Sequence, residues 1–145
     1  MRLKILIFAI TLSILYSCDR ELNEVNCSAL KKNGIEYYVD DDLYSGICLV
    51  FDKDVLVESR KIQNGVHKTT IGYWNSGEVK YTGGMKNDSL NGSYREYYRS
   101  GKIAKKGKFK MGYFNGRWKF TDEDGRILRI TTFKKGKIIS ETTKN

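Results

Sequence analysis

Three stretches of the sequence share one pattern at equal spacing: NSGEVKYTGGMK at residues 75–86, RSGKIAKKGKFK at residues 99–110 and EDGRILRITTFK at residues 123–134. Each stretch opens on a polar turn, and its glycine falls at the same place in Gly77, Gly101 and Gly125. Glycine adopts a positive φ without a Cβ clash, so it suits a tight turn. The pattern therefore indicates a repeated structural unit.

Other positions keep the same register. Two sets of apolar residues lie at a constant distance from the turn glycines: Val79, Ile103 and Ile127 form one set, and Met85, Phe109 and Phe133 form the other. A second turn recurs at nearly constant spacing at Gly65, Asp88, Gly112 and Gly136. An earlier unit follows the plan more loosely, with Asp54 where the glycine would stand. We therefore expect about four units within residues 44–145.

Within a unit, apolar and polar residues alternate with the period of a β-strand. The segment 102–109 is expected to place Ile103, Gly107 and Phe109 on one face and Lys106 and Lys108 on the other. Two short strands and two turns fit in about 24 residues, so each unit is predicted to be one β-hairpin. The expected fold is all-β, with stacked antiparallel hairpins in a single-layer twisted repeat sheet that has one packed and one solvated face.

The stretches GSYREYYRSGKI at residues 92–103 and GRWKF at residues 116–120 resemble bacterial variants of the MORN repeat. The resemblance extends over about residues 44 to 140. It implies stacked β-hairpins that serve as a scaffold or as a binding surface for proteins or membranes. Some bacterial proteins of this kind are labelled antitoxins, which fits poorly with an exported chain.

Residues 1–18 have the order of an export signal. A basic start at residues 1–4 precedes an apolar run at residues 5–15, which is too short to cross a bilayer comfortably. Leu15-Tyr16-Ser17-Cys18 resembles a lipobox, which implies that residues 1–17 form a cleaved signal helix and that Cys18 carries lipid. The alternative is an ordinary cleaved signal followed by a structural cysteine. We expect a lipoprotein anchored in the cell envelope, with residues 18–43 as a tether and lead-in segment.

Two cysteines remain, Cys27 and Cys48. An oxidising compartment allows a disulfide between them. Two isolated buried thiols are an equal alternative, because sequence alone does not show whether the two Cα atoms come close enough to bridge.

Charge is uneven along the chain. Residues 18–64 hold 6 basic and 10 acidic side chains, whereas residues 65–145 hold 18 basic and 7 acidic side chains, which gives net charges of −4 and +11. A candidate anion-binding strip comprises Lys105, Lys106, Lys108, Lys110, Lys134 and Lys135. The alternative is that these lysines only keep a solvated β face soluble. Nucleic acid is the least accessible anionic partner for an exported chain.

The sequence offers no catalytic set. His67 is the one histidine, so it is interpreted as a half-exposed strand residue rather than a base or a metal ligand. Asp40-Asp41-Asp42 lacks the loop of a calcium site and is interpreted as a solvated turn. The aromatic residues are expected to pack between units, although they could also stack on sugar rings. We expect no enzyme, no metal and no cofactor.

The main functional hypothesis is a membrane-anchored binding or scaffold module whose repeats dock another envelope protein. The alternatives are binding of anionic lipid or polysaccharide by the basic repeats, and an antitoxin-like role.

Overall fold

A computed structural model describes residues 24–144 of the chain. The strands are β1 (Glu24–Asn26), β2 (Lys31–Asn33), β3 (Glu36–Val39), β4 (Asp42–Leu43), β5 (Gly46–Asp52), β6 (Val55–Gln63), β7 (Val66–Tyr73), β8 (Val79–Lys86), β9 (Ser89–Tyr97), β10 (Ile103–Lys110), β11 (Tyr113–Thr121), β12 (Ile127–Lys134) and β13 (Lys137–Thr143). One turn of 3₁₀ helix, η1 (Cys27–Ala29), follows β1. No helix among residues 24–144 is long and apolar enough to cross a membrane.

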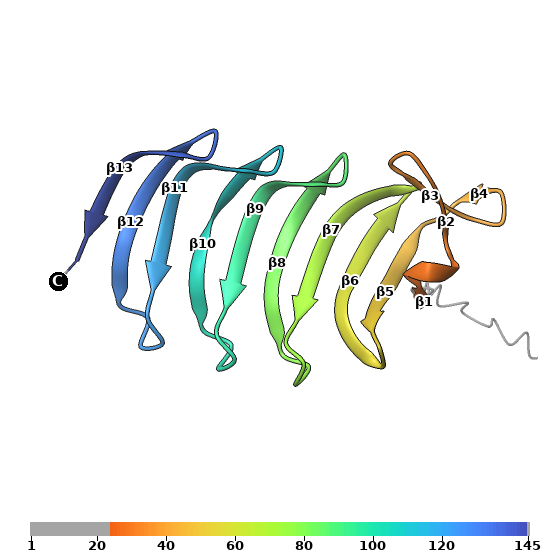
Figure 1. Ribbon diagram of the computed structural model, residues 1–145, viewed down its shortest axis with the longest axis horizontal. Coiled ribbons are helices and arrows are strands. Elements are labelled where there is room, and N and C mark those ends of the chain that lie inside the picture. The colour runs from red at the N-terminus through yellow and green to blue at the C-terminus, as the bar shows by residue number, and fades with distance from the viewer. Residues whose placement is uncertain (1–23, 145) are drawn as a thin grey trace, which may run out of the picture.

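The strands form one open sheet in which most sequence neighbours are also neighbours in space (Figure 1). The main path runs β1-β5-β6-β7-β8-β9-β10-β11-β12-β13, and every pair from β5 onward is antiparallel. The prediction of an all-β ribbon of stacked hairpins is therefore confirmed. Residues 1–17, which the sequence predicts to be a signal helix, lie outside the described residues.

The two predicted turn series lie at opposite edges of the ribbon. At one edge, Trp74 N donates to Glu78 O and Gly77 N donates to Trp74 O, both at 2.8 Å. The same pair of bonds recurs around Gly101 and Gly125. At these three glycines φ lies between +80° and +96°, so the turn requires a residue without a Cβ clash.

At the other edge, tight turns have positive φ at both central positions: Asn64 with Gly65, Asn87 with Asp88, Met111 with Gly112, and Lys135 with Gly136. Positive φ at both positions is the geometry that suits the right-handed twist of a hairpin. Gly112 N also donates to Leu90 O at 2.8 Å, and Gly136 N donates to Phe114 O at 2.9 Å. These bonds tie each turn to the hairpin before it.

Cross-strand pairing places one set of aromatic residues on the same face, which we call the aromatic face: Tyr81, Tyr94, Phe109, Phe114, Trp118, Phe120 and Phe133. Trp118 is fully buried there, between Phe114 at 4.3 Å and Phe109 at 5.1 Å between ring centroids. Tyr94 and Phe133 complete this cluster at 5.8 and 6.4 Å from the Trp118 ring. The cluster joins side chains from the neighbouring strands β9, β10, β11 and β12, so packing between units holds the stack together.

Glycines within the strands make room for these rings. A Cβ added to Gly107 would lie 2.3 Å from Trp118 Cδ2, and one added to Gly72 would lie 2.0 Å from Tyr81 Cε1. These glycines are not turn residues. Their role is steric, because an aromatic ring on the next strand lies directly over the bare backbone.

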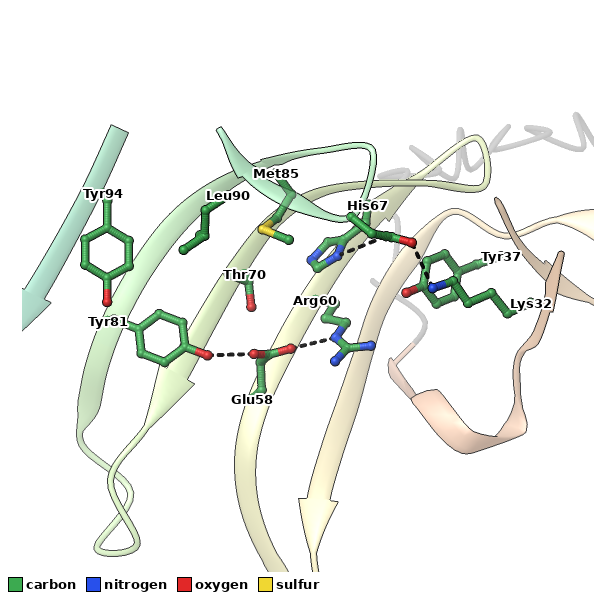
Figure 2. Close-up of a pocket in the computed structure, with 11 residues that line it drawn as sticks. Lys32, Tyr37, Glu58, Arg60, His67, Thr70, Tyr81, Met85, Leu90 and Tyr94 are labelled. Atoms are coloured by element: carbon green, nitrogen blue, oxygen red, sulfur yellow. Dashed lines mark hydrogen bonds and ion pairs between the residues drawn. The ribbon is translucent and has the colours of Figure 1, made fainter. Parts of the chain in front are cut away.

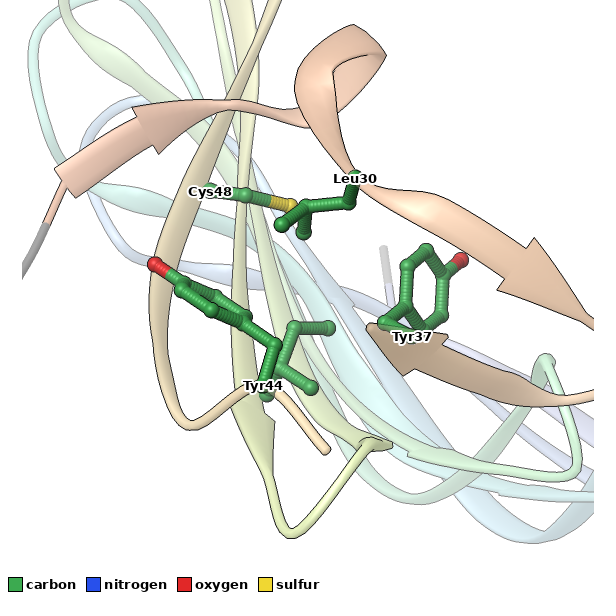
Figure 3. Close-up of a cluster of buried hydrophobic side chains, with 5 residues drawn as sticks. Leu30, Tyr37, Tyr44 and Cys48 are labelled. Atoms are coloured by element: carbon green, nitrogen blue, oxygen red, sulfur yellow. The ribbon is translucent and has the colours of Figure 1, made fainter. Parts of the chain in front are cut away.

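A folded cap closes the amino-terminal end of the ribbon. In it, β3 pairs with β2 and β4, and meets β7 where Glu36 lies opposite Val66. Leu30, Tyr37, Tyr44, Cys48 and Ile62 form a buried cluster between the cap and the first hairpin (Figure 3).

The structure contains the Cys27–Cys48 disulfide, with the two Cα atoms 4.8 Å apart. It joins η1 of the cap to β5. Residues 24–43 are therefore part of the folded domain rather than a tether, because their apolar side chains and the disulfide hold them against the first hairpin.

Candidate functional site

The face opposite the aromatic face carries a cluster of cations, and we call it the basic face. Arg95 of β9, Lys106 of β10 and Lys119 of β11 are direct cross-strand partners in one row. Adjacent strands lie about 4.8 Å apart, so three positive charges lie side by side. Lys108 and Arg117 belong to the same surface on β10 and β11.

The cations of the basic face lack acidic partners within residues 24–144. No ion pair there involves Arg95, Lys106, Lys108, Arg117 or Lys119. On the aromatic face, by contrast, Lys105 pairs with Glu96 at 2.8 Å and Arg129 pairs with Glu141 at 3.6 Å. The two faces therefore differ in their electrostatics. The aromatic face neutralises charges through ion pairs, whereas the basic face presents them to solvent.

Two shallow hollows meet at Lys106 and Lys119 on the basic face. One hollow, of about 620 Å³, is lined by all five cations. The other, of about 500 Å³, is lined by Ile103, Thr121 and Ile127 together with Lys102. The surface thus combines a basic region with a small apolar region, which suits a partner that carries both acidic and apolar groups.

The apolar part of this surface was not expected. The simple alternation of a strand placed Ile103 on the face of Phe109, but the register of β9 and β10 shifts between Ile103 and Lys105. Ile103 therefore lines the hollow of the basic face together with Ile127. The predicted face of Ile103 is wrong, because an irregularity in the pairing breaks the period of two.

The structure divides the lysines that the sequence grouped as an anion-binding strip. Lys106 and Lys108 lie in the basic cluster, whereas Lys105 points to the aromatic face and is neutralised by Glu96. Lys110 ends β10, and Lys134 and Lys135 lie at the turn between β12 and β13. The six lysines therefore do not form a single cluster: alternation along β10 sends Lys105 to the face opposite Lys106, and Lys134 and Lys135 lie at a separate turn.

Sequence reasoning missed Arg95, Arg117 and Lys119. The repeat itself contained a signal, since Arg95 and Lys119 occupy the same position in successive units. Lys106 lies between them only through the pairing of β10 with both neighbours.

Another hollow, of about 370 Å³, lies on the aromatic face beneath the cap (Figure 2). We call it the cap cleft. Its lining residues are Lys32, Tyr37, Glu58, Arg60, His67, Thr70, Tyr81, Met85, Asp88, Leu90 and Tyr94. They come from β2, β3 and strands β6 to β9, including the turn before β9, so only the folded ribbon assembles them.

Glu58 is the centre of a hydrogen-bonded group in the cap cleft. Arg60 Nε lies 2.6 Å from Glu58 Oε1, and the Tyr81 hydroxyl donates to Glu58 Oε2 at 2.6 Å (Figure 2). Burial acts to raise the pKa of Glu58, but the bonds from Tyr81 and Arg60 outweigh it and lower the pKa below its ordinary value. Burial, together with the Glu58 carboxylate, raises the pKa of Tyr81 to about 12. At neutral pH, Glu58 is thus an ionised acceptor and Tyr81 a neutral donor.

His67 is only 4% exposed, so its interpretation as a half-exposed strand residue is wrong. It pairs across strands with Ile62 and makes an edge contact with the Tyr37 ring at 6.4 Å. One ring nitrogen, Nε2, lies 3.1 Å from Thr69 O. Burial lowers the pKa of His67, and the positive charge of Arg60 lowers it further, so the ring is neutral at pH 7.

Within the described part of the chain, two buried polar atoms of the cap cleft lack a hydrogen-bond partner. They are Thr70 Oγ1 and Asp88 Oδ1. The Thr70 hydroxyl lies near enough to Glu58 to help lower its pKa, but it does not reach a partner at hydrogen-bond distance. Asp88 Oδ2 pairs with Lys32 Nζ at 2.8 Å, which links β2 to the turn before β9. Because buried polar groups are normally paired, these two atoms mark a place where a bound molecule could supply the missing partner.

The described residues contain no group of three or more His, Cys, Asp or Glu side chains able to hold a metal ion. The predicted lipid site at Cys18 lies outside the described residues.

A scan against protein-family models and searches of the curated proteins and the solved structures find no match to this chain.

Proposed function

We propose that the protein is a non-enzymatic, membrane-anchored binding module of MORN-like repeats, and that its basic face docks an acidic segment of another envelope protein. The observation that carries the proposal is the row of Arg95, Lys106 and Lys119, which has no carboxylate partner among the described residues. Lys108 and Arg117 extend the row. Like charges on directly opposite strand positions are destabilising. A partner with acidic groups would neutralise these cations and so relieve their repulsion.

The shape of the surface favours a protein partner. The hollow lined by Ile103 and Ile127 adjoins the cations through Lys106 and Lys119. An acidic chain segment with one apolar side chain would place the carboxylates against the cations and the apolar group in this hollow. A uniformly charged polysaccharide would leave the apolar hollow unused.

Residues 1–23 supply the other half of the proposal, the envelope location. The basic start, the apolar run and the lipobox-like Leu15-Tyr16-Ser17-Cys18 support export and lipidation of the chain. A lipid anchor of two or more acyl chains would hold the ribbon stably at the membrane.

The experiment is photo-crosslinking in the native envelope from a reactive amino acid placed at Ser93, which lines the basic hollow. We expect one discrete protein adduct, identified by mass spectrometry. The charge-reversed variant Lys106→Glu/Lys119→Glu should lose it. The matched control Lys134→Glu/Lys135→Glu changes the net charge by the same amount at the β12–β13 turn and should retain it.

The yield of the adduct should also fall with added salt, because exposed charges are screened over about 8 Å at physiological ionic strength. An adduct that survives the Lys106/Lys119 reversal, or no protein adduct at all, contradicts the docking proposal. Binding of vesicles that contain phosphatidylglycerol, lost in the same variant, would establish the second candidate function, direct binding of anionic lipid. The cations without ion-pair partners favour anionic lipid as well as an acidic protein. The apolar hollow favours the protein partner.

A further inference from the structure

The charges that line the cap cleft balance one another. Two cations, Lys32 and Arg60, line it together with two carboxylates, Asp88 and Glu58, and each cation is paired with one carboxylate. His67, the remaining base among the lining residues, is neutral at pH 7. A charged ligand would have to break one of these ion pairs. A neutral ligand would not.

The cleft is nevertheless rich in hydrogen-bonding groups. Thr70 is 4% exposed, and neither its hydroxyl nor the buried Asp88 Oδ1 has a hydrogen-bond partner within residues 24–144. Asp88 Oδ1 lies 3.9 Å from His67 Nδ1, which is too long for a hydrogen bond. A ligand that fits must therefore offer a donor to Asp88 and pair with the Thr70 hydroxyl. Hydroxyl groups do both, since each is a donor and an acceptor.

Aromatic rings lie at both ends of this polar group. Tyr81 and Tyr94 are stacked at 6.0 Å with an interplanar angle of 19°, and Tyr37 lies at the opposite end beside Lys32 (Figure 2). Rings that line a polar cleft suit a ligand with both an apolar face and a polar rim. A sugar ring has this character, since its C–H groups form a flat face and its hydroxyls surround it.

We propose that the cap cleft binds a neutral saccharide of one or two rings. The volume of about 370 Å³ lies at the small end of ligand pockets, which span about 300 to 1,000 Å³. Asp88 and Thr70 make the hydrogen bonds that the free cleft leaves unmade, and the Glu58–Arg60 pair presents further acceptors and donors. The bonds from Tyr81 and Arg60 lower the pKa of Glu58, so this carboxyl is not the neutral acid that glycoside hydrolysis needs.

The test is titration of the purified full chain with glucose, galactose, mannose, N-acetylglucosamine, cellobiose and chitobiose at millimolar concentrations, in a detergent without a sugar headgroup. Calorimetry gives the affinity, and saturation-transfer NMR gives the contacts of the sugar. We expect at least one of these sugars to bind, and glucuronate and galacturonate to bind more weakly than their neutral parents.

The variant Thr70→Val tests the site. It removes the hydroxyl and keeps the side-chain shape, so we expect binding to weaken by about threefold to tenfold, the effect of one lost neutral hydrogen bond. The fold should change little in stability, because the hydroxyl makes no hydrogen bond within the described residues of the free protein. Thr82→Val, on the opposite face of the adjacent strand, is the matched control and should bind like the parent chain.

The inference is independent of the basic face. The Lys106→Glu/Lys119→Glu variant should keep full sugar binding, so either proposal can fail alone. The saccharide proposal is overturned if none of the six neutral sugars binds, if the uronic acids bind more tightly, or if Thr70→Val binds as well as the parent chain.

Discussion

The contact between Gly107 and Trp118 gives the most direct test of how the ribbon is packed. Gly107 lies within β10 and is not among the residues with positive φ, so alanine would fit the backbone there. Its Cβ, however, would lie 2.3, 2.4 and 2.5 Å from three atoms of the Trp118 indole. Ordinary carbon contacts begin at about 3.5 Å, so the ring would have to retreat by about 1 Å.

Neighbouring side chains enclose the ring and oppose this movement. Trp118 is fully buried, with Phe114, Phe109 and Tyr94 around it, and its Nε1 donates to Lys108 O at 3.1 Å. Overpacking in such a site costs about 1–3 kcal/mol. Replacing a strand glycine also restricts the unfolded chain, and this offsets about 0.5–1 kcal/mol of the cost. With the clash near the top of its range, we expect Gly107→Ala to lower the free energy of unfolding by about 2 kcal/mol.

The assay is urea unfolding followed by tryptophan fluorescence and far-UV circular dichroism. A double-mutant cycle with Trp118→Leu isolates the clash. In the Trp118→Leu background the smaller side chain leaves room, so Gly107→Ala should become neutral or stabilising. If it costs the same about 2 kcal/mol in both backgrounds, the Trp118 contact is not the reason for the glycine and the packing argument is refuted.

Three further outcomes follow from the structure. Gly101→Ala, at φ +80° with no described atom within 4 Å of the added Cβ, should cost about 1 kcal/mol from backbone strain alone, and a cycle with Trp118→Leu should show no coupling. The double variant Cys27→Ser/Cys48→Ser should lower the stability by about 3 kcal/mol, because the bridge closes a loop between positions 21 apart; equal urea midpoints with and without reductant in the parent chain would contradict this. His67 has a folded-state pKa below its unfolded value of 6.5, so the unfolded chain binds the proton more readily and stability falls as the pH drops below 6.5. Urea midpoints at about pH 7.5 and about pH 5 should therefore differ less in His67→Gln than in the parent chain, and an unchanged difference would exclude this residue as the cause.

The repeat was predictable from the amino-acid sequence alone. Turns that need positive φ recur at a constant spacing, and alternation between them allows only strands, so hairpins in chain order follow from local chemistry. The turn glycines Gly77, Gly101 and Gly125 were identifiable for this reason. Turn conformation depends on a few adjacent residues.

Which side chains contact one another depends on how the strands pair in the folded chain. Arg95, Lys106 and Lys119 form a row because three strands pair in one register, and a shift of one residue would send any of them to the other face. The same reason separates Lys105 from Lys106.

The cap cleft was equally inaccessible from the sequence. Lys32 reaches Asp88 from a distant part of the chain, and His67 is buried where Tyr37 of the cap lies against it. Periodicity describes neighbours along one strand, whereas burial and ion pairing depend on segments that the fold brings together from far apart.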